Sequence, residues 1–99
     1  MATFMDPAYV EAKVTELERT AGAKVSDPQQ TIATVSKRLG FTQDQQASIL
    51  SHFIQGADVS AGGVLHAITA TAQTLDDGDA AYDMESKAVA AMELAASLR

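Results

Sequence analysis

The sequence predicts an all-α protein, a compact bundle of about five helices. Five segments carry apolar residues at steps of three and four, which is the period of an amphipathic helix. Each segment begins near a residue that commonly caps a helix, and no stretch shows the alternating β-branched pattern of a strand. With 99 residues, 46% of them hydrophobic, the chain is expected to form a single helical domain over residues 1–99. Residues 1–5 are expected to be a loose N-terminal tail.

The first two helices are predicted from a repeated Asp-Pro signal. Asp6-Pro7 and Asp27-Pro28 each place a side-chain acceptor at the cap and a proline in the first turn. Each segment then runs to the next glycine with one apolar face. These faces consist of Val10, Val14, Leu17 and Ala21 in the first helix and of Ile32, Val35 and Leu39 in the second.

The third and fourth helices are expected to pair as a hairpin. Thr42 and Gln45 have the spacing of a capping box, and Ser60 is expected to cap the fourth helix. Gly56 is expected to end the third helix with a positive φ. The predicted apolar faces are Ala47, Leu50, Phe53 and Ile54 in the third helix, and Leu65, Ile68, Ala72 and Leu75 in the fourth.

The last helix is predicted from about Ala80 to Ser97, after an acidic turn at 76–79 whose aspartates can cap it. Its apolar residues fall on two adjoining faces, which is typical of a helix packed on two neighbours or at a dimer contact. One face holds Met84, Ala88, Ala91, Ala95 and Leu98, and the other holds Tyr82, Val89, Met92 and Ala96.

The charge of the chain is unevenly distributed. The net charge is −6, and every charged residue between Arg38 and Lys87 is acidic. This half should carry a negative potential that repels nucleic acid and attracts basic protein surfaces. The carboxylates can form a solvated surface that keeps the protein soluble, or a surface that binds a partner in place of nucleic-acid phosphate. Under the second hypothesis, the partner-binding residues are Asp58, Asp76, Asp77, Asp79, Asp83 and Glu85.

The two histidines are candidates for a metal site or a catalytic pair. His52 and His66 lie in the two helices expected to pair, where they could meet. A zinc site needs further ligands, and the sequence has neither an HExxH motif nor a Cys/His spacing. Structural or surface roles are therefore favoured, and a small hydrolase that uses the histidines is a less favoured alternative.

Other motifs also argue against catalysis and against DNA binding. The 76–79 turn fails as an EF-hand, because Leu75 and Met84 would occupy ligand positions. The glycines do not form a phosphate-binding loop, and a helix-turn-helix over residues 43–75 would lack any Arg or Lys. We therefore expect no enzymatic activity, no catalytic residue, no metal, no cofactor and no direct nucleic-acid binding.

The sequence also bears on location. It contains no cysteine, which excludes disulfides and fits a reducing cytosol. It has no apolar run of about 20 residues and no basic segment followed by a hydrophobic one. A cytoplasmic protein without membrane contact is expected.

Residues 47–94 resemble the C-terminal portion of an uncharacterised family carried by phages and plasmids. The matching features are the helix end HFIQGAD, the helix GVLHAITATAQ and the acidic turn followed by AAYDME. The resemblance covers about half of the chain and transfers no catalytic residue. It implies a mobile-element setting, in which small acidic proteins often disarm host defence, as anti-CRISPR proteins do.

These observations lead to one functional hypothesis and one alternative. The hypothesis is a non-enzymatic inhibitor of the anti-CRISPR type that binds a basic surface of a host nucleoprotein complex in the host cytoplasm. The alternative is a structural or interaction module that forms a homodimer through its last helix.

Overall fold

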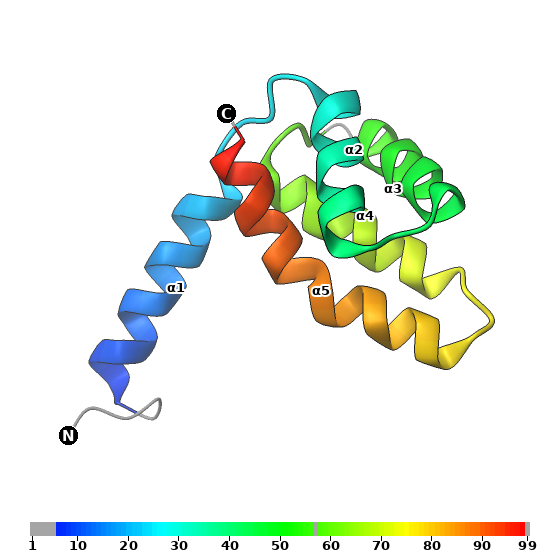
Figure 1. The fold of residues 1–99 in the computed structure, drawn as a ribbon. Coiled ribbons are helices and arrows are strands. Elements are labelled where there is room, and N and C mark those ends of the chain that lie inside the picture. The colour runs from blue at the N-terminus through cyan, green and yellow to red at the C-terminus, as the bar shows by residue number, and fades with distance from the viewer. Residues whose placement is uncertain (1–5, 57, 99) are drawn as a thin grey trace.

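All five predicted helices are present. The computed structural model describes residues 6–56 and 58–98 (Figure 1). Over these residues it contains no strand, and its one extended pairing is an isolated bridge between Lys24 and Ser60. The all-α bundle is therefore confirmed, while the expected tail at 1–5 lies outside the described residues. The helices are α1 Pro7–Ala21, α2 Pro28–Leu39, α3 Gln43–Gln55, α4 Ala61–Gln73 and α5 Gly78–Ser97.

The predicted helix starts are confirmed by their hydrogen bonds. The carboxylates of Asp6 and Asp27 each accept a backbone N–H of the first turn that follows. Thr42 and Gln45 form the reciprocal capping box: the Gln45 N–H donates to Thr42 Oγ1 at 3.1 Å, and the Thr42 N–H donates to Gln45 Oε1 at 2.9 Å. Ser60 Oγ likewise accepts the N–H of Gly63.

The helix ends follow two different geometries. Gly40 closes α2 with φ 78°, a left-handed conformation that favours glycine. Gly56 has φ −71°, so the prediction of a positive φ there is wrong. Its N–H donates to the His52 carbonyl at 2.9 Å, and the backbone stays right-handed as it leaves α3.

Helix α4 lies at the centre of the bundle. It packs against α5 and α3, and α2 contacts both of those helices. The residues of α4 are mostly small, which lets neighbouring backbones approach closely. Eight of them are buried: Ala61, Gly62, Gly63, Val64, Ala67, Ile68, Thr71 and Ala72.

The core differs in detail from the predicted faces. Phe53 is buried as predicted, but Ile54 is 60% exposed. Ile49, which the prediction omitted, fills the core one turn before Phe53. The buried stripe of α3 therefore runs along Ile49 and Phe53, and Ile54 follows by a rotation of about 100° that turns it to solvent.

Helix α1 forms an arm outside the core. It has no buried residue, and it extends away from the other four helices (Figure 1). Its C-terminal end is tied to them: Ala21 lies so close to Gly62 that a Cβ on Gly62 would sit 3.2 Å from the Ala21 Cβ. The linker after α1 is tied to the α3–α4 connection by a hydrogen bond, in which the Val25 N–H donates to the Val59 carbonyl oxygen at 2.7 Å. Of the predicted apolar face of α1, Ala21 packs against the core, whereas Val10, Val14 and Leu17 are largely exposed.

The tight packing around α4 predicts that one added methyl group at Gly63 destabilises the fold. A Cβ on Gly63 would overlap the Asp58 carbonyl oxygen and lie 3.0 Å from Phe53 Cε1. We expect Gly63→Ala to lower the free energy of unfolding by about 2 kcal/mol, as overpacking does. Gly78→Ala is the matched control, because a Cβ there meets nothing within 4 Å. It should raise stability by about 0.5 kcal/mol through the unfolded chain. Urea denaturation measures both, and equal stability of the two variants would contradict the packing.

Candidate functional site

Five of the six predicted partner-binding residues gather at one end of α5. They occupy the α4–α5 turn and the first two turns of α5, and all of them are exposed. We call this set the acidic end. It consists of Asp76, Asp77, Asp79, Asp83 and Glu85.

Two of these carboxylates have a role in the fold. Asp77 caps α5, and its Oδ1 accepts the N–H of Asp79 at 2.9 Å. Asp83 forms an ion pair with Lys87 at 2.9 Å, four residues later on the same helix. Over the described residues, the side chains of Asp76, Asp79 and Glu85 make no hydrogen bond or ion pair. These three carboxylates are the ones most accessible to a partner.

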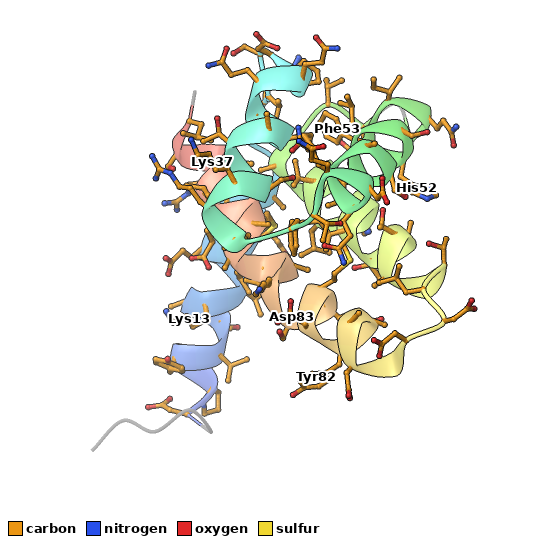
Figure 2. The ribbon with its side chains drawn as sticks, turned by 45° about the vertical axis from the view of Figure 1, so that its right-hand side comes forward. Lys13, Lys37, His52, Phe53, Tyr82 and Asp83 are labelled. Atoms are coloured by element: carbon orange, nitrogen blue, oxygen red, sulfur yellow. The ribbon has the colours of Figure 1, made fainter. Side chains whose placement is uncertain are left out.

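The acidic end surrounds α5 rather than forming a flat face. Met84 is fully buried, and its neighbours Asp83 and Glu85 each lie about 100° away on opposite sides of the helix. Tyr82 is 75% exposed beside them (Figure 2). A partner would therefore meet carboxylates from several directions, together with one aromatic ring.

Lys87 neutralises only part of the negative charge of the acidic end. Its Nζ donates to the Leu39 carbonyl at 2.9 Å and lies 5.7 Å from the centre of the Phe41 ring. The same ammonium pairs with Asp83. The first base after Arg38 thus joins α5 to the end of α2 and offsets one carboxylate.

Asp58 lies apart from the acidic end. It belongs to the α3–α4 connection, and the 13 residues of α4 separate that connection from the α4–α5 turn by about 20 Å. Its Oδ1 accepts both the N–H and the Oγ–H of Ser60, at 3.2 and 2.5 Å. The structure therefore brings five of the six residues together and gives Asp58 a local role.

The histidines share one shallow pocket. His52 of α3 and His66 of α4 both line a pocket of about 400 Å³, together with Asp58. None of the hydrogen bonds found within 6–56 and 58–98 joins these three side chains. In the same residues, no group of three or more His, Cys, Asp or Glu side chains could hold a metal ion.

A second surface was not predicted from the sequence. An apolar groove of about 340 Å³ opens at the base of the arm, between α1, α4 and α5. The apolar stripe of α1 was the signal for it, but periodicity does not say which element covers a stripe. The groove is lined by Val14, Leu17, Glu18, Ala21, Gly62, Leu65, His66, Val89 and Met92.

Comparison of the chain with protein families, with characterised proteins and with solved structures yields no match. The resemblance to a phage and plasmid family thus stays a prediction. None of the described helices is both long and apolar enough to cross a bilayer.

The contacts of Lys87 predict that two substitutions lower the free energy of unfolding by different amounts. Lys87→Met removes the donor to the part-buried Leu39 carbonyl, which should cost about 1–2 kcal/mol of unfolding free energy. Asp83→Asn is the control, because it breaks only an ion pair whose carboxylate is 56% exposed. That change should cost less than about 1 kcal/mol. Urea denaturation compares them, and a larger loss for Asp83→Asn would show that the carbonyl contact is unimportant.

Proposed function

We propose that this protein is a non-enzymatic inhibitor of the anti-CRISPR type, encoded by a phage or another mobile element. It binds a host CRISPR nucleoprotein complex in the host cytoplasm through the acidic end and blocks the access of nucleic acid. The observation that carries the proposal is the gathering of five exposed carboxylates at one end of α5.

Charge supports this mode of binding. Nucleic-acid channels are lined by Lys and Arg that contact phosphates, and a clustered set of carboxylates offers those residues an alternative partner. Complementary charge chiefly accelerates association and selects the partner. Asp76, Asp79 and Glu85 are the principal contacts in this proposal, and Asp77 and Asp83 add to the potential. Asp58 would take part only if the target also reached the opposite end of α4.

The arrangement favours binding over catalysis. His52, His66 and Asp58 line one pocket, and the Asp58 carboxylate already accepts two hydrogen bonds from Ser60. The acidic end presents its carboxylates on an exposed helix end. Such groups suit contact with a protein surface better than proton transfer, which benefits from a burial-shifted pKa.

Charge reversal at the acidic end tests the proposal. Asp76→Lys with Glu85→Lys removes two carboxylates that make no bond within the protein, so the fold should remain. Each replacement changes the charge by +2, and the double variant moves the net charge from −6 to −2. We expect at least a tenfold loss of affinity for a CRISPR complex captured from host lysate, together with loss of inhibition in a phage-interference assay.

The matched control places the same change on the arm. Glu11→Lys with Glu16→Lys also gives a net charge of −2, on exposed residues of α1. This variant should inhibit like the original protein. Equal inhibition by the two variants would contradict a role for the acidic end, and equal loss would point to total charge instead.

The alternative is an interaction module that forms a homodimer through α5. Fewer apolar residues of α5 are exposed for such a contact than the sequence pattern predicts. Met84, Ala88, Ala91, Met92 and Ala95 are buried within the protein itself. What remains for a partner is Tyr82, and Val89 at 45% exposure. A homodimer therefore needs a contact surface that extends beyond α5.

A further inference from the structure

We draw no further inference here: the strongest candidate, the apolar groove between α1, α4 and α5, carries none, because nothing within residues 6–56 and 58–98 shows what covers it.

Discussion

The close packing of α4 inside the other helices is the constraint on which the rest of the structure depends. Gly62 and Gly63 begin this helix, and side chains there would collide with the arm and with the α3–α4 connection. The sequence around these glycines lacks a phosphate-binding loop motif. Their observed role is steric: they allow three segments to meet at the start of one buried helix. Phe53 and Ile68 then fill the core that this meeting encloses.

The packing around α4 explains why the protein has two chemically different regions, the acidic end and the apolar arm α1. Helices α3 and α5 cover α4, and α2 packs on α3 and α5. Helix α1 contacts α4 and α5 without burying a residue, and it extends as an apolar arm. At the other end of α5 the chain turns back with carboxylates that solvent stabilises. The two regions are thus consequences of one packing arrangement. The acidic end is the region that we propose as the contact with a basic surface.

The helices and their starts could be predicted because their signals are local. Asp6, Asp27 and the Thr42–Gln45 box act within three or four residues, and each is observed. The core faces were less predictable, because Ile49 and Ile54 both fit a helical period and only tertiary packing decides between them. The acidic end could be predicted because its five carboxylates are close together in the sequence. Asp58 was included on charge alone, and charge carries no information about distance. The arm could not be foreseen, since an apolar stripe does not reveal whether its own chain covers it.

Hydrogen exchange of the backbone amides tests this account most directly. If α4 carries the stability of the fold, its amides should be the slowest to exchange, and the amides of α1, which buries no residue, should exchange much faster. Protection of α1 equal to that of α4 would contradict the account, because the arm would then share the stability of the core.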